Sequence, residues 1–300
     1  MKWRGRRKST HVTDRRGEAI PRSSGSNAAA GLLLGFFFRS SRKTKLAIIL
    51  VAIFAFTFFR GPMMEMIGLS ELAPTEQSHS GQNDEMRDYL SVMMADNETV
   101  WTNVLAKQGL RYRPANMIIY SQRTQIPGGI ADARMGPFYL PANETIYIDP
   151  SFFSELKEKF GAKGDFAEAY VVAHEYGHHI QNIMGRLQEL HTQRGTVSKK
   201  EYNQHSVRVE LQADFLAGVF AHHANNTFKE FLEAGDIEEA MRCAEAIGDD
   251  RLQQQSQGSV VRDSFTHGTS KQRAYWFQKG YTTGDLKEGE KLYTLPYSQL

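Results

Sequence analysis

The chain has 300 residues, of which 41% are hydrophobic and 23% are charged. This is enough for one sizeable globular domain with an appended segment. The composition excludes a collagen-like, a disulfide-stabilised and a wholly disordered protein, and the single cysteine, Cys243, excludes an intrachain disulfide. The net charge of +2 hides an asymmetry, because residues 1–45 carry +10 and the rest of the chain carries −8.

The basic leader, residues 1–45, begins with a stretch rich in Arg, Ser and Gly. Residues 1–30 contain few apolar side chains, so they cannot bury enough surface to offset the loss of chain entropy. We therefore expect a largely disordered leader. A nucleic-acid-binding arm is an alternative use of its charge, but the leader lacks interleaved aromatic residues, and we expect no nucleic-acid partner.

Two apolar blocks follow, at 31–38 and 46–59, with four basic residues between them. As a helix, the second block would be about 21 Å long at ~1.5 Å per residue, which is shorter than the ~20 residues usually needed to span a bilayer. Lys45 and Arg60 can extend its reach by placing their charges at the two interfaces. We expect residues 46–60 to form a transmembrane anchor.

The anchor predicts a topology. By the positive-inside rule, the basic leader lies in the cytoplasm and the body lies across the membrane. A buried core helix is an alternative interpretation of residues 46–60. A cleaved signal peptide is disfavoured, because the basic region is too long and no A-x-A site follows Phe59.

The body is predicted to have an α+β fold, with a small sheet followed by a mainly helical half. Residues 61–83 read as a linker, and the domain is expected over 84–300. A helix is predicted over 84–108, and 125–135 reads as a glycine-containing loop. Strands are predicted at 117–121, 138–140 and 145–149. From 165 onward, helix caps precede helical segments, first over 165–184 and then from Ser198 to about Ala224.

The predicted helix over 165–184 contains the sequence His174-Glu175-Tyr176-Gly177-His178, an H-E-x-x-H motif. Residues i and i+4 lie one above the other on a helix, so His174 and His178 can bind one metal ion. Glu175 lies about 100° around the helix, close enough to act on the attacking water without being a ligand. The neighbouring His179 cannot share the metal. Neutral imidazoles suit Zn²⁺, so we expect one zinc ion per chain.

A third ligand is expected from the next predicted helix, where Glu210 and Asp214 again lie at i and i+4. A carboxylate is the usual third ligand of a His₂Glu catalytic zinc site. The second carboxylate can accept the outer N–H of a ligating imidazole and fix its tautomer. We assign Glu210 to the metal and Asp214 to the outer contact with His174. The reverse assignment is the alternative.

Several segments resemble one family, the bacterial neutral zinc metallopeptidases. They are 1–7 (MKWRGRR), 135–139 (MGPFY), 172–179 (VAHEYGHH), 210–218 (ELQADFLAG), 246–252 (AIGDDRL) and 265–270 (FTHGTS). The resemblance covers nearly the whole chain and is weakest over 17–80. It implies a zincin-like, gluzincin-type fold in which His174, His178 and Glu210 bind zinc and Glu175 is the general base. It also implies a bacterial protein, hence an inner-membrane location with the domain outside the cytoplasm.

The expected function is therefore membrane-anchored, zinc-dependent hydrolysis of peptide bonds in a protein or peptide, by an endopeptidase rather than an exopeptidase. His267 and Tyr176 are candidates to stabilise the oxyanion, and gluzincin analogy suggests that strand 145–149 pairs with the substrate. One alternative is a catalytically inactive, membrane-anchored binding or scaffold protein that retains the zinc site. Another is a nucleic-acid or lipid binder that works through its leader.

Overall fold

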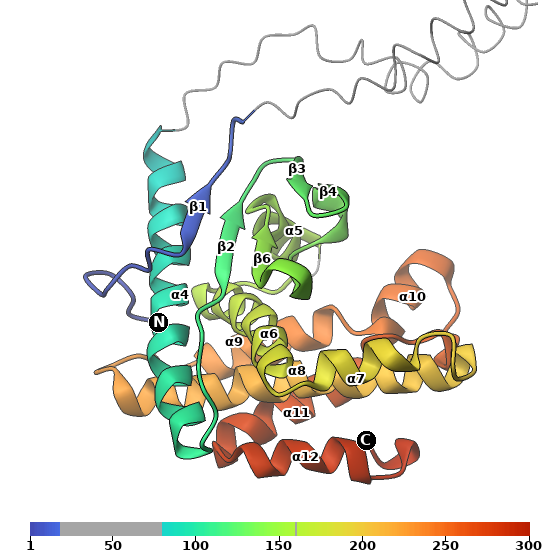
Figure 1. Ribbon diagram of the computed structural model, residues 1–300. Helices are drawn as coiled ribbons and strands as arrows, with labels where there is room; N and C mark the ends of the chain where they lie inside the picture. Colours follow the sequence, from blue (N-terminus) through green and yellow to red (C-terminus); the bar gives the residue numbers. More distant parts are fainter. Residues whose placement is uncertain (19–79, 160) are drawn as a thin grey trace, which may run out of the picture. The chain divides into compact units, whose positions relative to one another are not determined.

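A computed structural model describes residues 1–18, 80–159 and 161–300 (Figure 1). The strands are β1 (Val12–Asp14), β2 (Asn116–Ile119), β3 (Arg123–Ile126), β4 (Gly129–Asp132), β5 (Phe138–Leu140) and β6 (Thr145–Ile148). The α-helices are α4 (Ser80–Lys107), α5 (Ser151–Lys159), α6 (Asp165–Ile183), α7 (Arg186–Gln193), α8 (Lys199–Thr227), α9 (Asp236–Ala246), α10 (Asp249–Gln257), α11 (Ser270–Thr283) and α12 (Leu286–Thr294). This is the predicted α+β arrangement, with a small sheet followed by a helical half.

The main sheet has four strands in the order β1-β2-β6-β5. The first three are parallel to one another, and β5 runs antiparallel to β6, with Tyr139 opposite Ile146. Pairing of strand 145–149 with a substrate would require this strand to lie at the sheet edge. That expectation is wrong, because β6 has β2 on one side and β5 on the other. The loop expected over 125–135 is instead mostly an antiparallel hairpin of β3 and β4.

Residues 1–18 belong to the same compact unit as residues 81–300. The Trp3 ring packs on Tyr89 with 5.4 Å between ring centroids, and the Arg6 guanidinium lies over Phe231. The expected disorder of the leader is therefore wrong for residues 1–18. Its physical reason is that the basic side chains find acidic partners on the body. The ion pairs are Lys2–Glu230, Arg4–Glu85, Arg6–Asp96, Arg7–Glu98 and Lys8–Asp88.

The helical half is built around α8, which contacts α6 on one side and α11 on another (Figure 1). Glycines allow these close contacts. A Cβ atom on Gly177 of α6 would lie 3.0 Å from the Ala213 carbonyl oxygen of α8, and a Cβ atom on Gly280 of α11 would lie only 2.0 Å from the Phe215 carbonyl oxygen of α8. Gly177, which lies between the two histidines, thus lets α6 approach α8 closely.

The predicted anchor, residues 46–60, and most of the predicted linker lie outside the described residues. Within the part of the chain that the structure describes, no helix is both long enough and apolar enough to cross a bilayer. The first helix of the domain, α4, begins at Ser80, slightly before the expected boundary at residue 84.

Gly280→Ala is expected to destabilise the fold by about 3 kcal/mol, because the added methyl group overlaps the α8 backbone and forces the two helices apart. This cost exceeds the ~1 kcal/mol that alanine gains over glycine in helix propensity. Denaturant unfolding of the purified protein measures the change. Gly129→Ala is the control, since a Cβ atom there meets nothing within 4 Å. Equal stability of the two variants would contradict the close-packing argument.

Candidate metal centre

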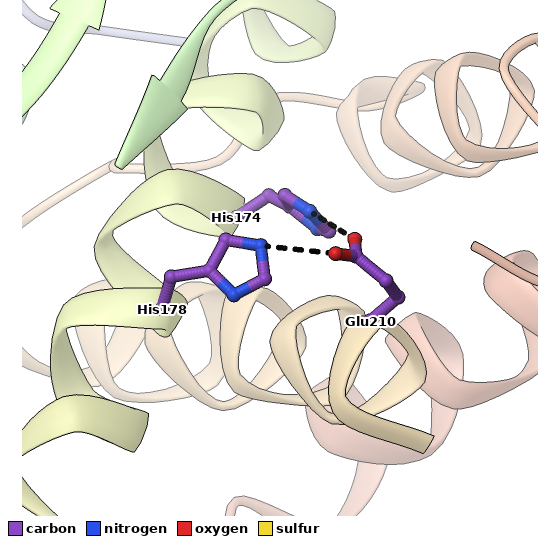
Figure 2. A group of neighbouring side chains, drawn as sticks. All are labelled: His174, His178 and Glu210. Carbon is purple, nitrogen blue, oxygen red and sulfur yellow. Dashed lines mark ion pairs between the residues drawn. The ribbon is translucent and has the colours of Figure 1, made fainter. Parts of the chain in front are cut away.

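Three candidate metal ligands meet where α6 faces α8 (Figure 2). The Nε2 atom of His174 lies 3.3 Å from one carboxylate oxygen of Glu210, and the Nε2 atom of His178 lies 3.6 Å from the other. One ligand atom from each residue lies within 4.8 Å of the others. The structure thus brings together the three residues that the sequence grouped, at distances that a single metal ion can bridge.

The outer nitrogen of each imidazole is already occupied. His174 Nδ1 lies 2.8 Å from Asp214 Oδ1, and His178 Nδ1 lies 2.8 Å from Gln181 Oε1. Both acceptors lack a proton to give, so each Nδ1 donates, and in the neutral ring each Nε2 offers its lone pair to a metal. Glu210 faces the Nε2 atoms and Asp214 faces Nδ1, so the geometry favours the first assignment of these two carboxylates over its reverse.

Arg273 of α11 extends the site to a third helix, and no local pattern in the sequence indicated it. Its Nε donates to Asp214 Oδ2 at 2.8 Å, and its Nη2 donates to Asp214 Oδ1 at 3.0 Å. The hydroxyl of Tyr170 also donates to Asp214. Burial opposes ionisation of Asp214, but the charges of Arg273 and His174 outweigh it and lower the pKa of Asp214 to about 2. Asp214 therefore stays ionised and fixed in orientation.

Gln181 is a second residue that sequence reasoning missed. Its amide nitrogen donates to the Val209 carbonyl at 2.6 Å and to Gln212 Oε1 at 3.0 Å. These two bonds leave the Gln181 oxygen facing His178. Because Gln181 lies three residues after His178 on α6, the i, i+3 spacing could have indicated this contact.

Glu175 lies beside the cluster in a buried position with 8% exposure. Among the described residues, no hydrogen bond or ion pair joins its carboxylate, whereas Asp214 is hydrogen-bonded to Arg273 and Glu210 lies within ion-pair distance of two imidazoles. Its charge nevertheless acts on the cluster. Burial lowers the pKa of His178, but the charges of Glu210 and Glu175 raise it above its usual value.

His267 lies in the loop before α11, held by Asp249 at the start of α10. Asp249 Oδ2 accepts the backbone N–H groups of Thr266, His267 and Gly268, and its other oxygen lies 3.2 Å from His267 Nδ1. The negative charge of Glu210 is the largest influence on His267 and raises its pKa. The imidazole of His267 is thus exposed to solvent and interacts electrostatically with the candidate ligand Glu210.

Tyr176 does not face the cluster, so the expectation that it stabilises an oxyanion is wrong. It is fully buried, and its hydroxyl lies 2.5 Å from that of Tyr112. Although Tyr176 lies between two candidate ligands in the sequence, positions 174 and 176 differ by about 200° around the helix, so their side chains lie on nearly opposite faces. His179 also points away from the cluster, between the Tyr139 hydroxyl and the Arg113 carbonyl.

Comparisons with known proteins identify the family of the chain. A model of the family described as "putative neutral zinc metallopeptidase" matches residues 1–292. The uncharacterized protein YpfJ of Escherichia coli (strain K12) is 41% identical over 290 residues, which cover 95% of this chain and 96% of that protein. The uncharacterized protein Rv2575 of Mycobacterium tuberculosis (strain H37Rv) is 41% identical over 197 residues, covering 63% and 64% of the two chains. No solved structure matches the chain.

Arg273→Gln is expected to weaken zinc binding by about 10- to 100-fold, because Asp214 loses the bidentate partner that orients it against His174. Leaving a buried carboxylate without its cation should also cost about 3–5 kcal/mol of stability. Competition with a chromophoric chelator measures the affinity, and circular dichroism reports on folding. The control is Arg242→Gln on the exposed face of α9. Unchanged zinc affinity in a folded Arg273→Gln protein would contradict the role given to Arg273.

Proposed function

Because the chain belongs to the neutral zinc metallopeptidase family, we propose that it is a zinc-dependent peptidase that cleaves peptide bonds within protein or peptide substrates. The observation that carries this proposal is the arrangement of His174, His178 and Glu210 around one point, with the buried Glu175 next to His174 on the same helix.

The residues present suit zinc. Two imidazole nitrogens and one carboxylate oxygen are the donor set of a catalytic His₂Glu site, and three protein ligands leave one position open. The outer contacts to Asp214 and Gln181 already hold both histidines in the tautomer that a metal requires. When bound, zinc would polarise the scissile carbonyl and make water acidic enough to attack near neutral pH.

Glu175 would act as the general base. It would accept a proton from the attacking water and pass it to the leaving amine as the peptide bond breaks. Its position next to His178 on the same helix, together with its lack of a hydrogen-bond partner among the described residues, supports this role. A carboxylate committed to an ion pair could not exchange protons so readily.

His267 would stabilise the oxyanion that forms on the substrate carbonyl. Asp249 binds Nδ1 of its ring, which leaves Nε2 free to donate a hydrogen bond toward the substrate. The influence of Glu210 on the pKa of His267 supports the placement of this ring close to the ligand cluster.

An extended substrate would pair with β5, not with β6 as the sequence suggested. β5 ends the four-stranded sheet, and its outer side has no strand partner among the described residues. It also contacts α6, which bears the two histidines. A strand edge without a partner can bind a peptide through backbone hydrogen bonds. This mode suits cleavage within a chain, because the substrate can continue in both directions.

We keep membrane contact through residues 46–60 as part of the proposal, because an exposed apolar block as long as the 14 residues at 46–59 is typical of an interaction site. The alternative of an inactive binding protein with a structural zinc ion is disfavoured by the three-ligand set, since structural zinc usually has four protein ligands. Among the described residues, no fourth His, Cys, Asp or Glu joins the cluster.

Glu175→Gln should retain zinc and lose catalytic rate by a factor of about 10²–10⁴, the usual contribution of a general base. His178→Ala, by contrast, should lose zinc as well as activity. Zinc content by elemental analysis and hydrolysis of a denatured-protein substrate measure the two effects. His191→Ala, on an exposed position of α7, is the control. Full activity of Glu175→Gln would exclude the proposed mechanism. Absence of zinc from the folded wild-type protein after zinc is supplied would exclude the proposed function.

His267→Ala should lower kcat by about 10²–10³-fold with little change in KM or zinc content, as expected for a donor used mainly in the transition state. Asp249→Asn is a useful companion, because it retains the size of the side chain but weakens its hold on the ring. A change confined to KM would instead place His267 in substrate binding.

A further inference from the structure

The N-terminal residues are integrated into the sheet that supports the metal centre. β1 pairs in parallel with β2, whose other neighbour is β6. The Met117 N–H donates to the His11 carbonyl at 2.8 Å, and the Arg15 N–H donates to the Ile119 carbonyl at 2.8 Å. Residues on both sides of the 19–79 segment therefore share one hydrogen-bonded sheet.

The same residues also pack against α4, the first helix after the segment. The Ser9 N–H donates to the Ser91 carbonyl at 2.9 Å, and Trp3 packs on Tyr89. The ion pair between Arg6 and Asp96 is largely buried, with side-chain exposures of 17% and 4%. Figure 1 shows β1 lying along α4. Separation of residues 1–18 from the domain would expose this apolar surface and leave Asp96 without its cation.

The ion pairs also bear on whether the charge of the basic leader indicates membrane topology. Its charge was the basis for placing the N-terminus in the cytoplasm and the domain outside. Yet five of its twelve basic residues, those within positions 2–8, are paired with acidic residues of the body. Charges that bind the domain are poor topological signals, because the positive-inside rule concerns loops that lie beside the membrane.

We infer that residues 1–18 and the domain at 81–300 lie on the same side of any membrane that the chain meets. A folded sheet cannot be shared across a bilayer, so the chain between residues 18 and 81 must cross an even number of times or not at all. This replaces the single-pass arrangement expected from the sequence, in which one crossing separates the two parts. It applies whatever residues precede Met1, and it does not depend on zinc or on peptidase activity.

The lengths of the apolar blocks bear on how many times the chain can cross a membrane between residues 18 and 81. Two crossings need two spans of ~20 residues, whereas the sequence offers one block of 14 residues and one of eight. At ~1.5 Å per residue, the shorter block would extend about 12 Å as a helix, less than half of the ~30 Å hydrocarbon core. The sequence therefore does not offer two spans of the usual length.

Cysteine accessibility in the full-length protein tests this inference, and the chain suits the method because its single cysteine, Cys243, is buried. Thr10→Cys and Gln255→Cys each place one thiol on an exposed position, the first before β1 and the second on α10. Both variants are treated with a membrane-impermeant maleimide in spheroplasts and again after lysis. The wild-type chain measures any background from Cys243.

The expected result is the same pattern for both thiols, either labelled in intact spheroplasts or protected until lysis. Labelling of one thiol and protection of the other would overturn the inference. Resistance to limited proteolysis shows that each variant is folded, and Lys8→Cys with Lys287→Cys forms a second exposed pair on the same two parts. Because a zinc-free or inactive protein gives the same labelling pattern, failure of the proposed function and failure of this inference are distinguishable.

Discussion

The close approach of α6 and α11 to α8 is the constraint on which the site depends. Where Gly280 meets the backbone of α8, any side chain would force the helices apart. At this separation one buried carboxylate, Asp214, reaches both the imidazole of His174 on α6 and the guanidinium of Arg273 on α11. The orientation of the candidate metal ligand His174 thus depends on how closely the helices pack. A shift of either helix against α8 would disturb it.

A second constraint is electrostatic and acts over the whole chain. A leader with a net charge of +10 and a body with −8 look like two separate parts in the sequence. In the structure, basic residues within positions 2–8 form ion pairs with acidic residues of the body, as in Arg7–Glu98 and Lys8–Asp88. Exposed pairs of this kind contribute little individually. Together with the backbone bonds of β1 and the packing of Trp3, they place the N-terminal residues on the domain.

Local signals in the sequence were sufficient for part of this structure. The H-E-x-x-H spacing depends only on helix geometry, so His174 and His178 could be placed on one face before any fold was known. Glu210 followed from the same rule on a second helix. Arg273 could not be found this way, because its partner Asp214 is 59 residues away and no local spacing links them. Neither the identity of the edge strand nor the pairing of β1 with β2 could be predicted, because strand order depends on contacts between residues far apart in the sequence.

The pattern of buried charge bears on the choice between a catalyst and a binding protein. Burying carboxylates is costly unless each one is paired. Asp214 has Arg273 and His174 as partners, and Glu210 lies between two imidazoles. Glu175 is 8% exposed, and among the described residues no hydrogen bond or ion pair holds its carboxylate. A protein that used its zinc only for structure would have no need of such a group. A peptidase needs it, because the proton of the attacking water must have somewhere to go.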